Sequence, residues 1–329
     1  MKTILILSSL LSIAAAVGRT TAPSGALVVG DDGDYSTIQD AVDALSTSSS
    51  EEQIIFIQPG TYKEQVFIDS LSGPLTIYGS TSDTSSYSSN EVIITAGESQ
   101  ETQSNNDLTA TLRVHTSDFK LYNVDVVNSY GEGSQALALS AYAENQGYYA
   151  CSFTGYQDTI LAEIGAQIYA SCYIEGATDF IFGEEGQAWF EQCDIGVLEA
   201  SKGYITASGR DSSSSASYYV INNSTVATAS GNTVPSGAYY LGRPWREYAR
   251  VAFQDTALSD VVNSAGWAIW NTGDERTDNA EFGEYDNTGE GSEGTRADFA
   301  TELGEPVAIA DVLGSGYASA AYFDADYVG

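Results

Sequence analysis

Four polar residues recur at a nearly constant spacing, and they are the strongest candidates in the chain for chemistry. Gln135, Gln157 and Asp179 are separated by 22 residues at each step. Asp158 directly follows Gln157 and lies 21 residues before Asp179. If the fold repeats at this period, two amides and two carboxylates converge on one face, where a carboxylate pair can carry general acid/base chemistry. The alternative is an internal polar ladder, because buried polar groups need hydrogen-bond partners.

Two other kinds of catalytic site lack their residues in this sequence. A Ser-His-Asp esterase needs a histidine base, and the single histidine, His115, lies in the strand-like stretch LRVHTSDF, where a structural role is expected. No serine occupies the middle of a Gly-x-Ser-x-Gly motif, the usual setting of such a nucleophile. The chain also has no histidine cluster and no paired cysteine motif of the kind that binds zinc. Acid/base chemistry must therefore come mainly from carboxylates.

The elements that would position these residues follow the same period. Cys151, Cys172 and Cys193 lie 21 residues apart, inside the similar phrases GYYACSFTGY, QIYASCYIEG and AWFEQCDIG. Each phrase is a short β-rich run that ends in small or turn residues, with no helical pattern between the runs. Such a repeat predicts a stacked β-solenoid with parallel strands. A β-sandwich also has regularly spaced short strands, but it does not require one side-chain type to recur at this interval.

The cysteine spacing leads to a geometric expectation. Residues one coil apart should stack about 4.8 Å from one another along the solenoid axis. This separation falls within the Cα distance of about 4.4–6.8 Å that a disulfide requires. A Cys151–Cys172 or a Cys172–Cys193 bridge is therefore possible, and so is a ladder of small buried thiols.

One short helix is expected near the N-terminus, in the stretch YSTIQDAVDALS. Ser36 and Gln39 fit a capping box at its start. An apolar stripe occupies one face of this helix, namely Ile38, Ala41, Val42 and Leu45. A helix here would cap the open end of the solenoid core, as a terminal repeat must. The Gly- and Glu-rich tail from Asn271 is expected to wind along the outside of the coils.

The first residues resemble an export signal. Lys2 supplies a positive start, residues 4–13 an apolar run, and residues 14–16 three alanines suited to cleavage. A membrane anchor is the alternative, but the apolar stretch is shorter than the roughly 20 residues that a spanning helix needs. We therefore expect residues 1–17 to be a signal peptide and residues 18–329 to form a single β-helix domain that is secreted to the extracellular space.

The charge of the chain limits its partners. Twelve Lys and Arg residues stand against 45 Asp and Glu residues, for a formal net charge of −33. Neither nucleic acid nor an anionic membrane surface is expected as a partner, because both are bound mainly by basic residues. No feature suggests an oligomer seam, so a monomer is expected. The overlapping sequons that begin at Asn222 and Asn223 are candidate glycosylation sites.

Five sequence blocks carry a family resemblance: GTYKE at 60–64, GSQALAL at 133–139, GYQDTI at 155–160, DFIFG at 179–183 and LGRPW at 241–245. With these blocks in this order, the chain resembles the pectin methylesterases from about Asp34 to Asp324. The stretches GWAIW at 266–270 and EYDNTGEG at 284–291 are similar to the C-terminal block of that family. The resemblance implies a right-handed parallel β-helix and no metal or other cofactor. It also implies hydrolysis of the methyl esters of homogalacturonan (pectin), which releases methanol and leaves pectate.

The resemblance assigns catalytic roles to the four polar residues. Asp179, in DFIFG, matches the nucleophile that attacks the ester carbonyl and forms an acyl-enzyme. Asp158, in GYQDTI, matches the acid that protonates the departing methanol and then acts as a base on water. Gln135 and Gln157 match the amides that donate hydrogen bonds to the tetrahedral oxyanion.

Three further residues match positions that bind substrate or support the site. Arg243, in LGRPW, matches the arginine that keeps the nucleophilic carboxylate ionised, and Trp245 matches an aromatic residue beside it in the sugar-binding groove. Thr111, in TATLRV, is expected as a further substrate contact. Trp267 and Trp270 could stack on sugars, but we expect both to belong to the framework.

Two other functions are compatible with the same fold. A pectate lyase or polygalacturonase acts on the same polymer, and a lyase would need a calcium site and a base placed to remove a proton from the sugar ring. The chain has few basic residues and no Asp-rich calcium loop. A non-catalytic wall-binding protein would be expected to have lost Asp158, Asp179 or Arg243, and the sequence retains all three.

Overall fold

A computed structural model describes residues 17–328 of the chain. The predicted signal peptide lies outside the described residues, apart from its last residue, Val17. Among the described residues, no helix is long and apolar enough to cross a membrane.

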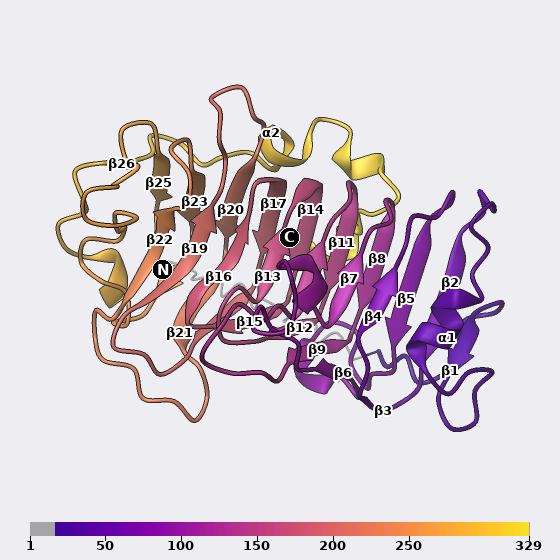
Figure 1. The fold of residues 1–329 in the computed structure, drawn as a ribbon. Coiled ribbons are helices and arrows are strands. Elements are labelled where there is room, and N and C mark those ends of the chain that lie inside the picture. Colours follow the sequence, from indigo (N-terminus) through magenta and orange to yellow (C-terminus); the bar gives the residue numbers. More distant parts are fainter. Residues whose placement is uncertain (1–16, 329) are drawn as a thin grey trace, which may run out of the picture.

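Three parallel sheets wind along one axis, and successive coils add a strand to each sheet (Figure 1). The predicted all-β, right-handed parallel β-helix is confirmed, with the right-handed crossovers that parallel strands favour. The eleven-stranded sheet contains β1 (Leu27–Val29), β2 (Gln53–Ile57), β5 (Leu75–Gly79), β8 (Phe119–Tyr122), β11 (Gln146–Tyr149), β14 (Ile164–Ala170), β17 (Glu185–Glu191), β20 (Tyr218–Asn222), β23 (Arg250–Gln254), β25 (Glu281–Tyr285) and β26 (Ala300–Glu302).

The other two sheets are shorter. The seven-stranded sheet contains β22 (Tyr239–Pro244), β19 (Gly203–Ser208), β16 (Thr178–Gly183), β13 (Ile160–Ala162), β10 (Leu139–Ala141), β7 (Leu112–Val114) and β4 (Val66–Ile68). The eight-stranded sheet contains β24 (Ala257–Leu258), β21 (Thr225–Thr228), β18 (Asp194–Val197), β15 (Tyr173–Gly176), β12 (Ser152–Thr154), β9 (Asp125–Asn128), β6 (Val92–Ala96) and β3 (Gly60–Tyr62). The short helices are α1 (Ile38–Asp43), η1 (Tyr87–Ser89), η2 (Asp107–Thr109), η3 (Glu290–Ser292), α2 (Ile309–Leu313), η4 (Tyr317–Ser319) and η5 (Ala325–Tyr327).

Side chains one coil apart stack inside the solenoid, as the repeat predicts. The rings of Tyr148 and Tyr169 are 4.8 Å apart, and those of Tyr169 and Phe190 are 4.6 Å apart. The three cysteines lie in the same core as free, fully buried thiols. The thiol of Cys172 donates to the carbonyl oxygens of Tyr148 and Ala170, both at 3.4 Å. Of the two alternatives left open by the sequence, the structure has the thiol ladder.

At the corner between the eleven-stranded and eight-stranded sheets, most coils have one residue with positive φ, where the chain changes direction. These corner residues are Asn123, Ala150, Ser171, Gln192, Asn223, Asp255 and Asp286. Asn223 is exposed at its corner, whereas the amide of its neighbour Asn222 is engaged with Glu191 and Gln254. Of the two predicted glycan acceptors, Asn223 is the more exposed in this structure.

Helix α1 closes the N-terminal end of the core, and its predicted apolar stripe is buried. The predicted capping box is wrong by one residue. The N-cap is Thr37, whose hydroxyl accepts from the Asp40 N–H. The Gln39 side chain donates instead to Asp43 and to a backbone carbonyl. The carboxylate of Glu64 accepts from the first two N–H groups of the helix, those of Ile38 and Gln39, each at 2.9 Å, so a residue from another coil completes the cap.

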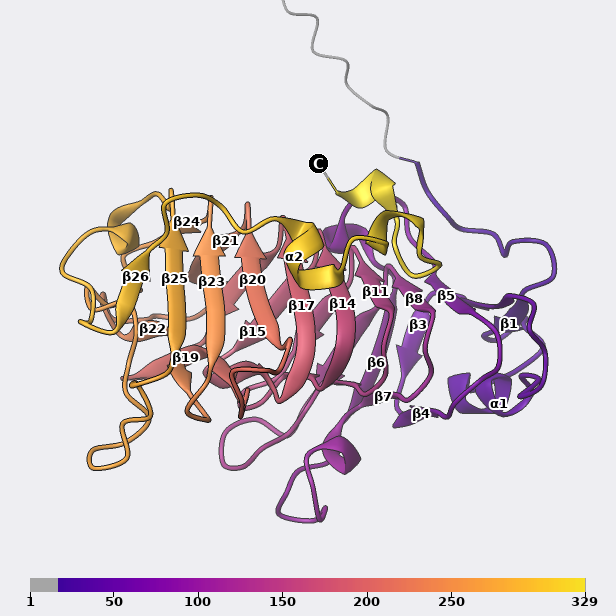
Figure 2. The ribbon, with the colours of Figure 1, turned by 90° about the horizontal axis from the view of Figure 1, so that it is seen from above.

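The C-terminal tail follows the prediction only in part. Strands β25 and β26 extend the eleven-stranded sheet beyond Asn271, so the coils continue to Glu302. Residues 303–328, here called the C-terminal strap, then run back over the outer face of that sheet and cross β17 and β14 (Figure 2). The strap is fixed by hydrogen bonds from Tyr149 to the Tyr322 carbonyl and from Tyr327 to the Thr84 carbonyl, both at 2.6 Å.

Candidate active site

Asp158 and Asp179 lie on adjacent coils at the start of two strands of the seven-stranded sheet. One residue, Thr159, separates Asp158 from β13, and the Asp158 N–H donates to the Thr178 carbonyl at 3.0 Å. Gln157 pairs with Thr178, not with Asp179. The predicted stack of Gln135, Gln157 and Asp179 is therefore wrong at its last step. The physical reason is that this coil repeats at 21 residues, as the pairing of Ile160 with Ile181 shows, so Asp158 lies level with Asp179.

The backbone at both aspartates is in an unusual conformation. Asp158 has φ 64° and Asp179 has φ 50°, both in the left-handed region. Asp adopts this region more readily than most residues, at a cost on the order of 1 kcal/mol. The pairing of β16 with β19 also shifts register between Thr178 and Ile181. Irregularities of this kind re-aim side chains and are common beside active sites.

Arg243, on β22, forms a bidentate ion pair with Asp179. Its Nε and Nη2 atoms donate to the two carboxylate oxygens at 2.9 and 2.7 Å. The Asp179 side chain is 9% exposed and that of Arg243 is 16% exposed, so water screens the pair little. Burial raises the pKa of Asp179, and the hydrogen bonds and charge of Arg243 oppose this rise.

Asp158 has a different electrostatic environment. Burial raises its pKa well above the ordinary value, and the negative charge of Asp179 raises it further. The Gln157 side chain and the more distant Arg243 lower it only in part. Two neighbouring carboxyls of this kind cannot easily both ionise. The arrangement therefore favours a proton on Asp158 and a charge on Asp179.

Two aromatic rings enclose the guanidinium of Arg243. Its central carbon lies 4.0 Å from the centre of the Tyr204 ring and 4.3 Å from that of Trp270. Trp267 has the framework role expected of it, because it is buried and stacks on Phe282 at 4.4 Å. Trp270, for which the same role was expected, lies against the candidate site.

Sequence reasoning missed Tyr204 because its coil has a different length. The structure pairs it with Thr178 across 26 residues, whereas the preceding coils repeat at 21 residues. No spacing signal in the sequence links Tyr204 to the site, although its aromatic type is suited to packing on an arginine.

The remaining predicted residues occupy different environments. Gln135 and Gln157 are partly exposed, and an open cavity of about 750 Å³ beside Gln157 is also lined by Lys202. Trp245 packs against Phe182 with ring centres 6.0 Å apart. It belongs to a separate apolar cluster on the outer face of the seven-stranded sheet, formed by Ala110, Leu137, Leu161, Phe182 and Ala207.

The structure does not bring Thr111 into the site. Its side chain is fully buried, and its hydroxyl donates to the Val127 carbonyl at 2.9 Å. This placement gives no support to the expected contact between Thr111 and substrate. Among the described residues, no group of three or more His, Cys, Asp or Glu side chains is arranged to hold a metal ion.

Comparison with known proteins gives a consistent result. The Pectinesterase family model matches residues 26–300. A pectinesterase from Aspergillus niger is 55% identical over 98% of both chains, and one from Aspergillus aculeatus is 53% identical over 95% of this chain and 96% of its own. The crystal structure of a pectin methylesterase from Aspergillus niger matches with a TM-score of 0.88 and 44% identity, covering 94% of this chain and all of that one. The pectin methylesterase from carrot matches with a TM-score of 0.82 and 27% identity, over 92% and 98% of the two chains.

Proposed function

The chain belongs to the pectinesterase family of carboxylic ester hydrolases, and from this premise we propose that Asp179 and Asp158 hydrolyse the methyl esters of homogalacturonan. The observation that carries the proposal is the unequal carboxyl pair. Asp179 is held by a bidentate arginine, while Asp158, level with it on the preceding coil, accepts no hydrogen bond from an arginine of residues 17–328 and has a strongly raised pKa. A nucleophile must be ionised and a general acid must be protonated, and this environment favours both states at one pH.

In the first half-reaction, a carboxylate oxygen of Asp179 attacks the ester carbonyl carbon. The resulting tetrahedral oxyanion accepts hydrogen bonds from Gln135 and Gln157, each donor lowering the barrier by about 3 kcal/mol. When the intermediate collapses, the bond to the methoxy oxygen breaks and Asp158 gives its proton to that oxygen. Methanol leaves, and the galacturonate acyl group remains bonded to Asp179.

In the second half-reaction, Asp158 is ionised and takes a proton from a water molecule. The water oxygen attacks the acyl carbon and displaces the Asp179 carboxylate. The products are a free galacturonate carboxylic acid group, an ionised Asp179 and a protonated Asp158, so both residues return to their starting states. The partly exposed Trp245, beside Phe182, offers an apolar surface for the sugar ring.

We further propose that the enzyme acts as a secreted monomer on highly methylated pectin. A net charge of −33 opposes binding of the polyanionic product. Nearly neutral, methylated segments meet no such opposition. The preference should therefore be most evident at low ionic strength, where charges are least screened.

The proposal is tested by methanol release from highly methylated pectin in the presence of a metal chelator. The wild type should release methanol, and Asp179→Asn, a nearly isosteric change, should reduce the rate by at least about a thousandfold because an amide is a poor nucleophile. Asp260→Asn, at an exposed aspartate, is the matched control and should retain full activity. A fully active Asp179→Asn variant would exclude Asp179 as the nucleophile. Ultraviolet-absorbing unsaturated products would indicate a lyase instead.

A further inference from the structure

The seven-stranded sheet presents a continuous row of side chains on the face opposite the core. In β4, β7 and β10 the first and last residues belong to the core, so the middle residues, Phe67, Arg113 and Ser140, lie on the other face. Strand pairing places these residues in register with one another. The same register continues through Leu161, Phe182, Ala207 and Arg243. One side of the sheet therefore connects the candidate catalytic residues with the N-terminal coils.

A flat aromatic pair lies on this face, in the two coils that precede the coil of Asp158. The rings of His115 and Tyr142 are stacked, with centres 4.9 Å apart and planes inclined by 16°. The Phe67 ring also meets His115 edge-on, with ring centres 5.0 Å apart. Tyr142 is 36% exposed, and it is the only aromatic residue among the exposed large hydrophobic side chains of residues 17–328.

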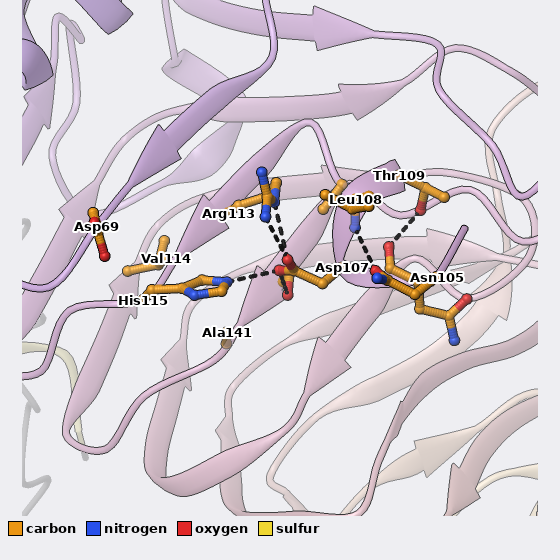
Figure 3. Close-up of polar contacts among 12 residues, drawn as sticks. Asp69, Asn105, Asp107, Leu108, Thr109, Arg113, Val114, His115 and Ala141 are labelled. Atoms are coloured by element: carbon orange, nitrogen blue, oxygen red, sulfur yellow. Dashed lines mark hydrogen bonds and ion pairs between the residues drawn. The ribbon is translucent and has the colours of Figure 1, made fainter. Parts of the chain in front are cut away.

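A hydrogen-bond network holds the pair in place. Asp107, on η2, makes hydrogen bonds with His115 Nε2 at 2.9 Å and accepts from the Ser140 hydroxyl at 2.8 Å. It also accepts from Arg113 Nη2 at 2.6 Å (Figure 3). The Arg113 guanidinium in turn covers the Phe67 ring at 4.4 Å. Asp107 and Phe67 thus fix the orientation of the His115 imidazole. The ring of Tyr142 stacks on this imidazole.

We propose that Tyr142, supported by His115, is a distal subsite that binds a sugar ring of the galacturonan chain by stacking. This inference rests on the proposed function, because it assumes that the polymer occupies this face. Aromatic rings pack well against the apolar faces of sugars. Arg113, the arginine beside the pair, is already neutralised by Asp107, and the charges of Glu163 and Glu184 act on Tyr142, so the subsite recognises the ring rather than a free carboxylate.

The position of the pair makes the subsite specific for long chains. Tyr142 lies beside Glu163, whose N–H donates to the Ala141 carbonyl. Glu163 is five residues beyond Asp158, which corresponds to roughly 16 Å along an extended strand. One sugar ring cannot span that separation. Only a chain of several units can occupy the catalytic residues and Tyr142 together.

The test compares Tyr142→Ala with Tyr142→Phe on two substrates, highly methylated polymeric pectin and a methylated galacturonate trimer. With Tyr142→Ala, KM for the polymer should rise about three- to tenfold, the loss expected for one stacking contact. Both kcat and the kinetics on the trimer should stay unchanged. Tyr142→Phe should restore the wild-type KM because it keeps the ring. Tyr285→Ala, at a partly exposed tyrosine of the eleven-stranded sheet, should have no effect.

An unchanged KM on the polymer, an equal rise on both substrates, or failure of Tyr142→Phe to restore binding would overturn the proposal. A binding measurement separates this failure from failure of the proposed chemistry. In gels that contain pectin, retardation of the Asp179→Asn protein should decrease when Tyr142→Ala is added. Retardation that does not depend on Tyr142 would exclude the subsite whatever the catalytic mechanism is.

Discussion

Replacing Arg243 by lysine should move the acid limb of the activity profile to higher pH. Arginine bridges both oxygens of Asp179, at 2.9 and 2.7 Å, whereas a lysine nitrogen cannot reproduce this planar fork. The substitution therefore removes about one charge-assisted hydrogen bond, worth about 1.5–3 kcal/mol. Since one pKa unit corresponds to about 1.4 kcal/mol, the pKa of Asp179 should rise by about one to two units.

The direction of the effect follows from the role of Asp179. The nucleophile must be ionised, so activity is lost as the pH falls through its pKa. A raised pKa makes this loss begin at higher pH, while kcat/KM should recover toward the wild-type value above both pKa values. The measurement is kcat/KM for methanol release across the acidic and neutral range, with a thermal melt to confirm that the variant is folded.

A matched control lies three residues further along the chain, just beyond the end of β22. Arg246 pairs with Glu184 at 2.8 Å, and the side chains of this pair are 44% and 31% exposed. Arg246→Lys should leave the acid limb unchanged, because an exposed pair is screened by water. If the acid limb of a folded Arg243→Lys enzyme stays in place or moves to lower pH, then Arg243 does not keep Asp179 ionised, and the reasoning is refuted.

Three further substitutions test separate parts of the structure. Gln157→Ala should lower kcat on the order of a hundredfold at an unchanged melting temperature, as expected for loss of one oxyanion donor; an undiminished kcat would remove Gln157 from the mechanism. Asn223→Gln should abolish glycosylation at this corner, as measured by the mass of the secreted protein. Asn222→Ala should keep the glycan but lower stability by about 1–3 kcal/mol, because the buried side chains of Glu191 and Gln254 each lose a hydrogen-bond partner; a glycan that disappears with Asn222 would reverse this assignment.

Much of the fold could be predicted because the solenoid repeats its contacts at a fixed interval. The spacing of Cys151, Cys172 and Cys193 determines which side chains stack, and the structure confirms that period. The start of α1 could not be predicted to the residue, because Ser36 and Thr37 are both good caps. The choice depends on Glu64, which reaches the helix from another coil. The prediction that the whole tail lies outside the coils was wrong for β25 and β26. These segments form strands by pairing onto the preceding coil of the eleven-stranded sheet.

The candidate site was predictable where its residues belong to recognisable blocks. Asp158, Asp179 and Arg243 are such residues, and their ion pair and unequal environments agree with that expectation. Tyr204 was not predictable, since the longer coil between β16 and β19 interrupts the period. Thr111 was misplaced because the sequence does not reveal that its hydroxyl points to a backbone carbonyl.

The C-terminal strap imposes an order on folding. Neighbouring coils join residues 18 to 46 positions apart, so the solenoid can grow coil by coil as the chain is synthesised. The strap instead joins Tyr327 to Thr84, 243 residues away, and Tyr149 to Tyr322, 173 residues away. Its docking surface exists only after those coils have formed, and its own residues follow every coil along the chain. Until the strap docks, the apolar outer face of the eleven-stranded sheet is open to water, and a growing chain therefore carries an aggregation-prone surface that the strap later covers.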